Sequence, residues 1–249
     1  MIFIDRKILA RLQQFDTPTV CNVIEVFNVR PRDEGYADGR LKALFPEMPP
    51  VVGYAATARF QSCRTDSDEA VSYSSLVGQV AEFLEKIPEP RIVVFEDVDS
   101  PPVGATFGEV MCSVYKAFGC VGLITSGAAR DLVQVRAMGF PCWCSTMIAS
   151  HAYCRILETD VPVTIGGLKV QPGDLIHADA NGIAAIPKEL AREIALGCGL
   201  VAEAENEVMH YVRSGKPTVE GLRECNQRWK DGCANVPARV RALLDSGTV

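Results

Sequence analysis

The chain has 249 residues, of which 48% are hydrophobic and 22% are charged, and these proportions suit one folded domain with a full core. The formal net charge is −6 and no cluster of lysine and arginine stands out, which argues against a nucleic-acid partner bound through its phosphates. No segment approaches the roughly 20 apolar residues of a membrane helix, and the N-terminus lacks the apolar core of a signal peptide. We therefore expect a cytoplasmic protein with no membrane partner.

Helix and strand signals alternate in the first half of the chain. Apolar residues at helical spacing predict helices up to Phe27, with Thr17-Pro18 as a start signal. Proline, glycine and mixed charge over residues 28–50 predict a long surface connection. The other elements expected here are a strand at 51–60, a helix at 66–86 and a buried strand at 91–95.

The second half continues the alternation and then changes character. We expect a helix near 107–118, a strand at 120–125, a helix near 131–138 and a strand at 141–145, an order that indicates α/β architecture with some parallel pairing. Glycine, proline and asparagine turn signals divide residues 161–187 into three short strands, which predicts an antiparallel meander. A long helix should follow from Lys188 to Arg213, with one or two short helices after it.

Ten cysteines are scattered along the chain without a CxxC pair. Most of them stand among apolar neighbours, which favours reduced, buried thiols in a cytosolic protein. Their spacing is wrong for a cysteine-rich metal site.

The stretch from Cys120 to Asp131 is the most informative one. An apolar strand ends in small residues, and the loop then presents Arg130 beside Asp131. Arginine offers a fork of donors to a carboxylate or an enolate, and aspartate offers oxygen to a cation such as Mg²⁺. The alternative is structural: Asp131 caps the following helix, and Arg130 pairs with a nearby carboxylate. The local pattern leaves both interpretations open.

A second candidate is the helix start at Gly108-Glu109. Free amides in a first turn can bind an anion, and glycine lets a ligand approach the backbone. An ordinary helix start with Glu109 favourably placed in the first turn explains the same pattern. Twenty residues lie between Glu109 and Arg130, the length of a helix, a turn and a strand, so both loops are expected at the same sheet end.

A third candidate is Glu205, which interrupts an apolar stripe. One face of the long predicted helix carries Ile194, Cys198, Val201, Glu205, Val208 and Val212. A carboxylate in such a stripe is expected to be paired, to lie at a subunit boundary or to point into a site. A stripe edge at which Glu205 reaches water is the alternative.

Other catalytic patterns find no support. His151, His177 and His210 show no metal-ligand spacing, and we interpret all three as structural or surface residues. The absence of GxSxG argues against a serine nucleophile. Glycine-rich nucleotide patterns are also absent, which argues against NAD, ATP and a Rossmann-type methyltransferase.

Four motifs in this order resemble the RraA-like family, which includes the 4-hydroxy-4-methyl-2-oxoglutarate aldolases. They are Gly53-Tyr-Ala-Ala-Thr-Ala, Phe107-Gly-Glu-Val, Gly122-Leu-Ile-Thr-Ser-Gly-Ala-Ala-Arg-Asp and the run from Gly166 to Pro187. The resemblance covers roughly residues 15–215. It implies one domain over 1–249 with a swivelling β/β/α fold, mixed sheets and flanking helices, and 216–249 as a helical extension. It also implies a homotrimer or homohexamer with active sites at subunit interfaces.

The resemblance also implies roles for particular residues. Asp131 would ligate Mg²⁺ or Mn²⁺, and Arg130 would hold the keto or enolate oxygen of the substrate. The amides of Gly108, Glu109, Val110 and Met111 would receive the pyruvyl carboxylate. Glu205 would approach the waters of the metal from an adjacent subunit, and Glu109 would stand beside the site as an acid.

The expected activity is therefore metal-dependent cleavage of a 4-hydroxy-2-oxo acid to pyruvate, with oxaloacetate decarboxylation at the same site. A water on the cation, tuned by Glu205 or Glu109, is the expected base. Aldolase-type members usually carry an acidic residue three places after the aspartate, where this chain has Gln134. They also often carry a Gly-Asp-Asn segment, where this chain runs from Arg64 to Ala70. The alternative function is a non-catalytic regulator that binds ribonuclease E.

Overall fold

The computed structural model describes residues 3–64 and 74–247. Two compact units make up the chain: residues 1–3 with Glu34–Ile186, and Ile4–Asp33 with Pro187–Val249. The expected single domain over 1–249 stays a prediction, and each unit is described by itself. Within the described ranges, no helix combines the length and the apolar character that a membrane crossing requires.

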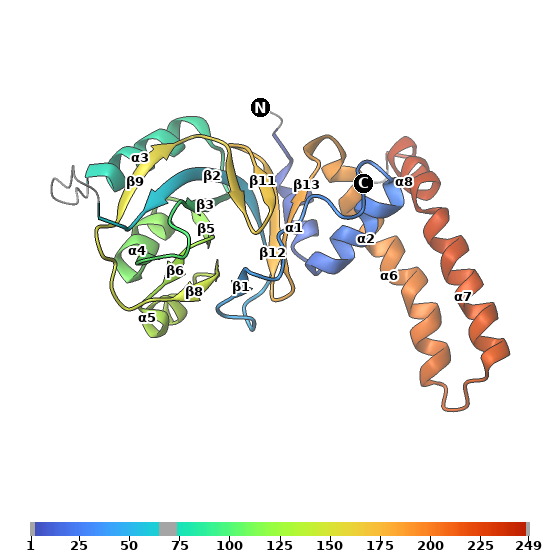
Figure 1. Ribbon diagram of the computed structural model, residues 1–249. Helices are drawn as coiled ribbons and strands as arrows, with labels where there is room; N and C mark the ends of the chain where they lie inside the picture. The colour runs from blue at the N-terminus through green and yellow to red at the C-terminus, as the bar shows by residue number, and fades with distance from the viewer. Residues whose placement is uncertain (1–2, 65–73, 248–249) are drawn as a thin grey trace. The chain divides into compact units, whose positions relative to one another are not determined.

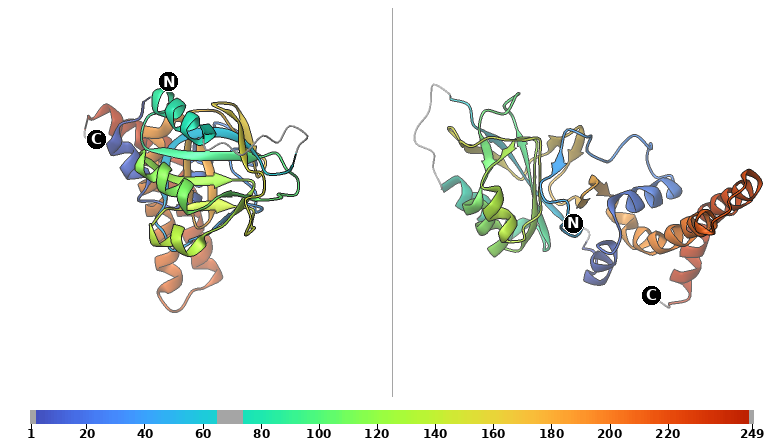
Figure 2. Two further views of the ribbon diagram at one scale, coloured as in Figure 1. Left: turned by 90° about the vertical axis from the view of Figure 1, so that its left-hand side faces the viewer. Right: turned by 90° about the horizontal axis from the view of Figure 1, so that it is seen from below.

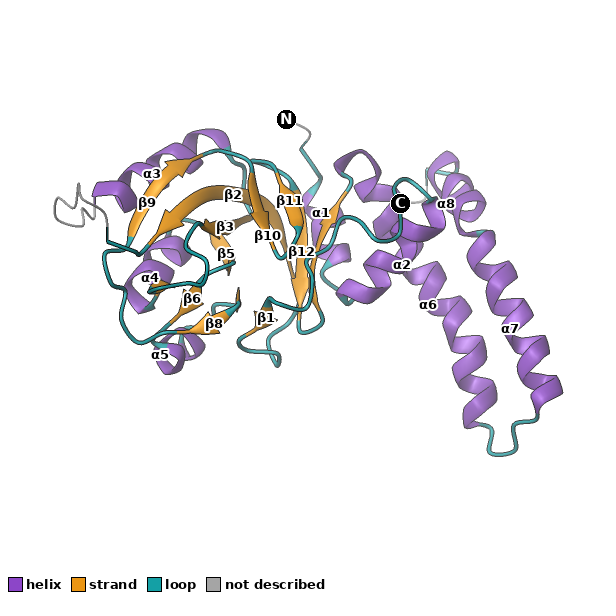
Figure 3. Ribbon diagram, in the orientation of Figure 1, coloured by secondary structure: helices purple, strands orange, loops and turns teal. Residues whose placement is uncertain are grey.

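The first unit is built on an eight-stranded mixed sheet (Figures 1 and 3). Its strands, in spatial order, are β1 (Lys42–Ala43), β7 (Cys142–Cys144), β5 (Cys120–Thr125), β3 (Arg91–Asp97), β2 (Val51–Gln61), β12 (Leu175–Asp179) and β13 (Gly182–Ile186), with β9 (Arg155–Thr159) pairing to β2. The strands β7, β5, β3 and β2 are parallel to one another, and β1, β9, β12 and β13 join antiparallel. The predicted α/β class with mixed sheets is confirmed.

Both faces of the central strand β3 are covered, which explains its nearly continuous apolar sequence. On one face Ile92 and Val94 pack in a cluster with Ile165 and Val170 of a small hairpin. On the other face the ring of Phe95 lies 6.3 Å from that of Tyr115. The helices α3 (Ser74–Lys86), α4 (Glu109–Ala117) and α5 (Leu132–Ala137) lie together on this second face (Figure 2).

Most predicted helices and strands are present within two or three residues of the expected bounds. The helix expected at 66–86 is α3, and residues 65–73 lie outside the described residues. The ten cysteines, all in described positions, form no disulfide, as expected.

The prediction of a three-stranded meander at 161–187 is wrong. Four strands form two hairpins: β10 (Val163–Ile165) pairs with β11 (Leu168–Val170), and β12 pairs with β13. Gly166 and Gly167 both have positive φ and close the first hairpin tightly. The amide of Gly173 then donates to the carbonyl of Ala55, so the chain joins β2 in the main sheet instead of continuing beside β11.

A small parallel sheet, which the sequence did not predict, lies beside the main one. It consists of β4 (Ala105–Phe107), β6 (Ala128–Ala129) and β8 (Thr146–Met147). These strands have two or three residues each, too short for periodicity to reveal. By pairing, they bring together the loops that follow β4 and β6.

The second unit is helical. Its elements are α1 (Arg6–Leu12), α2 (Thr17–Phe27), the 3₁₀ turn Lys188–Leu190, α6 (Ala191–Arg213), α7 (Val219–Ala234) and α8 (Val236–Asp245). Helix α2 begins as predicted, with Asp16 accepting a hydrogen bond from the amide of Thr19. Gly197 allows α6 to pack closely on α2, since an added Cβ would lie 2.7 Å from Val23 Cγ1.

Candidate functional site

Two β–α turns of the first unit meet at one edge of the small sheet. β4 leads into α4, and the parallel neighbour β6 leads into Arg130 and Asp131. The amide of Arg130 donates to the carbonyl of Phe107, which ties the two turns together at 3.2 Å. The expectation that the Glu109 and Arg130 loops share a sheet end is confirmed, although the small sheet and not the main one aligns them.

Asp131 does not cap the helix that follows it. It occupies the position before α5 in a left-handed conformation, with φ 55° and ψ 41°, and its side chain makes no capping bond to that helix. Instead Oδ2 accepts a hydrogen bond of 2.9 Å from the amide of Glu109, the first residue of α4. The alternative in which Asp131 caps the helix that follows it is therefore wrong. The carboxylate accepts its hydrogen bond from the first turn of the neighbouring helix α4 and not from α5.

Gly108 makes this arrangement possible. A Cβ at this position would lie 2.3 Å from Asp131 Oδ2 and 3.1 Å from Arg130 Nε. Its φ of −154° is ordinary extended backbone, so close approach and not conformation requires the glycine here.

The Arg130 guanidinium stays available to a ligand. Its Nε lies 3.8 Å from Asp131 Oδ2, too far for a hydrogen bond. Both side chains are about one-third exposed. Two half-buried groups of opposite charge thus stand side by side and keep hydrogen-bonding capacity.

These residues line a cavity of about 160 Å³. Its lining residues are Phe60, Leu76, Ala105, Thr106, Phe107, Gly108, Val110, Met111, Arg130, Asp131, His151, Cys154, Arg155 and Ile156. The structure therefore brings together all the predicted site residues of the first unit except the Glu109 side chain, which is exposed and does not line this cavity. Among the described residues, no three His, Cys, Asp or Glu side chains group as metal ligands.

Another part of the cavity wall contains residues that sequence reasoning missed. His151, Cys154 and Arg155 come from the loop between β8 and β9 and from the start of β9. His151, interpreted above as structural or surface, is exposed and forms a hydrogen bond of 2.8 Å between Nδ1 and the carbonyl of Ala152. No spacing in the sequence links this loop to Arg130, so no local signal could have found it.

Burial determines the state of the Cys154 thiol. Desolvation raises its pKa, and the nearby Arg130 guanidinium offsets part of that effect. The thiol is therefore protonated near neutral pH and is a poor nucleophile.

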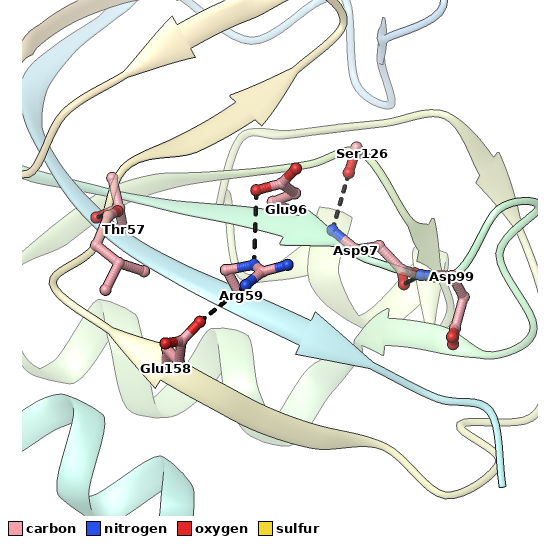
Figure 4. Close-up of polar contacts among 8 residues, drawn as sticks. Thr57, Arg59, Glu96, Asp97, Asp99, Ser126 and Glu158 are labelled. Carbon is pink, nitrogen blue, oxygen red and sulfur yellow. Dashed lines mark hydrogen bonds and ion pairs between the residues drawn. The ribbon is translucent and has the colours of Figure 1, made fainter. Parts of the chain in front are cut away.

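A buried carboxyl group, Asp97, stands at the end of β3 (Figure 4). Its backbone amide donates to Ser126 Oγ at 2.9 Å, and Oδ1 accepts from the amide of Asp99 at 3.0 Å. Oδ2 has no partner within the part of the chain that the structure describes. Desolvation, with the charge of Asp99 adding to it, raises the pKa of Asp97 to about 6, against a lowering effect of the Asp99 amide.

An ion cluster on the same strands is more exposed. Arg59 Nη1 lies 2.9 Å from Glu158 Oε2, and its Nε lies 3.9 Å from Glu96 Oε2 (Figure 4). It links β2, β3 and β9 at the surface, where such pairs contribute little to stability.

Glu205 belongs to the second unit. It lies on α6, and its Oε1 accepts a hydrogen bond of 3.2 Å from Asn22 Nδ2 of α2. The apolar stripe is buried as far as Val201, but Val212 is 45% exposed. Glu205 thus stands where the stripe leaves the core, and it lines a cleft of this unit together with Trp229 and Lys230.

Comparison with known proteins places these features in one family. The family model described as "RraA-like: Aldolase/RraA" matches residues 17–185. A protein of Halalkalibacterium halodurans named "Putative 4-hydroxy-4-methyl-2-oxoglutarate aldolase" is 35% identical over 100 residues, which cover 40% of this chain and 48% of that protein. The chain thus spans about half the length of this curated relative.

Two solved structures share the fold. An uncharacterised protein from Pseudomonas syringae has a TM-score of 0.68 at 22% identity, covering 91% of this chain and 95% of its own. The Streptomyces coelicolor protein RraAS2, described as an unusual member of the RNase ES inhibitor RraA family, has a TM-score of 0.63 at 24% identity, covering 87% of this chain and all of its own.

Proposed function

We propose, from the premise that this chain belongs to the RraA-like family, that it is a divalent-metal-dependent aldolase. Its substrate would be a 4-hydroxy-2-oxo acid such as 4-hydroxy-4-methyl-2-oxoglutarate, and its product pyruvate. Oxaloacetate, whose decarboxylation forms the same enolate, would be a second substrate.

The observation that carries this proposal is the position of Arg130 and Asp131 against the first turn of α4. The amides of Val110 and Met111 belong to the first turn, where no intrahelical acceptor exists, and both residues line the cavity. They can receive the carboxylate of a 2-oxo acid. The Glu109 amide is already bound to Asp131, so it takes no part in this binding.

Arg130 would stabilise the enolate oxygen. Cleavage of the C3–C4 bond leaves a negative charge on the pyruvyl fragment, and a guanidinium held in place beforehand stabilises that charge. The bond from the Arg130 amide to the Phe107 carbonyl fixes the backbone of the arginine, and its guanidinium lies beside the Asp131 carboxylate before substrate binds.

Asp131 fits a cation that keeps most of its waters. Its Oδ2 is held by the Glu109 amide, and no hydrogen bond to Oδ1 occurs among the described residues. Mg²⁺ commonly takes only one or two carboxylates and retains water, so a single aspartate suffices. Such a cation would supply Lewis-acid polarisation of the C2 carbonyl.

Glu205 enters the proposal through assembly. We propose a homotrimer or homohexamer in which the Glu205 carboxylate of one subunit reaches the cavity of another. Its position at the exit of the apolar stripe, half-exposed and beside a cleft, supports a role at a subunit boundary.

The first test measures pyruvate. The purified protein with Mg²⁺ or Mn²⁺ should release pyruvate from 4-hydroxy-4-methyl-2-oxoglutarate and from oxaloacetate, and chelation should abolish both reactions. Arg130→Gln and Asp131→Asn should each lower turnover by at least about a hundredfold. Asparagine keeps an acceptor for the Glu109 amide and tolerates the left-handed backbone, so Asp131→Asn should fold and assemble normally.

Arg136→Gln is the matched control, because Arg136 lies on α5 and pairs on the surface with Glu47 at 2.7 Å. Its turnover should equal that of the wild type. If the wild type releases no pyruvate from either substrate, the aldolase proposal is abandoned in favour of the non-catalytic ribonuclease regulator.

A further inference from the structure

We propose that His151 Nε2 is the base that removes the proton from the C4 hydroxyl of the substrate. This inference rests on the proposed aldolase function. It assigns a catalytic group to the wall of the cavity that lies in the β8–β9 loop.

The hydrogen bond of His151 fixes which ring nitrogen can accept a proton. Its Nδ1 lies 2.8 Å from the carbonyl oxygen of Ala152, and a carbonyl can only accept, so Nδ1 carries the hydrogen. In the neutral ring Nε2 is then the acceptor. The local backbone therefore sets the tautomer that a base requires.

Backbone contacts hold the His151 loop against β4. The amide of Ala105 donates to the carbonyl of Ser150 at 2.8 Å. Gly104 lets the loop approach closely, since a Cβ there would lie 2.8 Å from both the carbonyl carbon and the carbonyl oxygen of His151. Ala152 has a φ of 47°, a conformation that costs free energy in a residue other than glycine. The loop is thus positioned by the same short strand that leads into Gly108.

The other groups that a subunit contributes to its own cavity are poor bases. The titratable residues among those described as lining it are Arg130, Asp131, His151, Cys154 and Arg155. Arginines stay protonated, and burial raises the pKa of the Cys154 thiol. Asp131 is bound to the Glu109 amide and is the residue proposed to hold the cation. Glu109 itself does not line the cavity.

The step balances without a further reactant. Nε2 takes the C4 hydroxyl proton, and the O–H electron pair forms the new C4 carbonyl. The C3–C4 bond breaks, and its electron pair forms the enolate of pyruvate beside Arg130. The exposed imidazolium then returns its proton to solvent water, and the enolate takes a proton from water at C3. Decarboxylation of oxaloacetate forms the same enolate but removes no hydroxyl proton, so it does not need His151.

The test is His151→Asn, with both substrates measured on the same preparation. The asparagine Nδ2 can keep the bond to the Ala152 carbonyl, while the Nε2 acceptor is lost. Cleavage of 4-hydroxy-4-methyl-2-oxoglutarate should fall by at least about a hundredfold, the usual contribution of a general base. Oxaloacetate decarboxylation should stay within about twofold of the wild type, because no uniform binding interaction has been removed. Added imidazole should restore part of the cleavage in the His151→Gly variant.

His210→Gln is the control, since His210 lies exposed on α6 in the second unit. Unchanged cleavage in His151→Asn, or an equal loss of both reactions without imidazole rescue, would overturn the inference and leave the aldolase proposal standing. Absence of both reactions in the wild type would instead overturn the proposed function, and this inference with it.

Discussion

Two parts of the cavity lining share a backbone arrangement, a left-handed residue beside a glycine. We call them the Arg130 wall and the His151 wall. One wall holds Asp131 in a left-handed conformation against Gly108. The other holds His151 beside Ala152, also left-handed, against Gly104. In each wall a glycine is required because the neighbouring atoms leave no room for a Cβ.

The difference lies in how each wall is positioned. The Arg130 wall follows from two β–α turns whose strands pair in parallel. The His151 wall depends on an irregular loop whose backbone bonds reach Ala105 of β4 and, through the Tyr153 amide, the carbonyl of Ser62. A regular repeat of strand and helix thus places one part of a site predictably, whereas an irregular loop can complete the site without any periodic signal.

The largest effect is expected from a substitution in the Arg130 wall. Gly108→Ala puts a Cβ 2.3 Å from Asp131 Oδ2, so the carboxylate must move and the Glu109 bond is lost. Both cleavage and decarboxylation should fall by about a hundredfold or more, because misplacing the reacting groups by about 1 Å costs that much. Overpacking should also lower the free energy of unfolding by about 1–3 kcal/mol.

The matched control is Gly78→Ala on α3, where no described atom outside the backbone of its own helix lies within 4 Å of the added Cβ. Steady-state pyruvate assays and chemical denaturation on the two variants check this prediction. Wild-type activity in a folded Gly108→Ala protein would show that Asp131 is not held by this contact.

A smaller and more selective effect is expected from a substitution in the His151 wall. Gly104→Ala places a Cβ 2.8 Å from the His151 carbonyl group, which must shift the loop. If His151 acts as proposed, aldol cleavage should fall by about tenfold while decarboxylation changes little. Substrate-dependent kcat values, with Gly78→Ala again as control, measure the difference. An equal loss of both reactions would mean that Gly104 supports the whole cavity and not one wall.

The sequence predicted the Arg130 wall because its signals are local. An apolar strand that ends in Gly-Ala-Ala before Arg130 marks a strand–loop edge, and the spacing to Glu109 aligns two such edges. Even so, pattern alone placed Asp131 as a cap of the following helix as readily as a ligand. Only the structure shows that the Asp131 carboxylate accepts a hydrogen bond from the Glu109 amide of α4 and does not cap α5.

The His151 wall could not be predicted for a physical reason. The strands β4, β6 and β8 have two or three residues, so their pairing leaves no periodic trace. His151 stands in a loop whose partners are backbone atoms, and backbone hydrogen bonds do not depend on side-chain type. Glu205 illustrates a third case, in which the apolar stripe was recognised correctly and the pattern left a stripe edge at Glu205 open; only the structure shows that the stripe leaves the core there.

The smallest expected effect concerns Asp97, the buried carboxyl group at the end of β3. Its pKa is raised from 3.8 to about 6 in the folded protein, so the folded state binds more protons than the unfolded state between these values. The stability contribution of this group is therefore highest below pH 4 and is lost as the pH rises toward 6. The loss amounts to at most about 3 kcal/mol for a shift of this size.

Asp97→Asn should remove that dependence, because the amide has no proton to lose and still offers an acceptor to the Asp99 amide. The free energies of unfolding of the two proteins, measured from pH 4 to 7.5, should diverge. That of the wild type should fall relative to that of the variant as the pH rises. Asp231→Asn, an exposed aspartate on α7, should follow the wild-type curve throughout. Parallel curves for Asp97→Asn and the wild type would show that folding does not raise the pKa of Asp97.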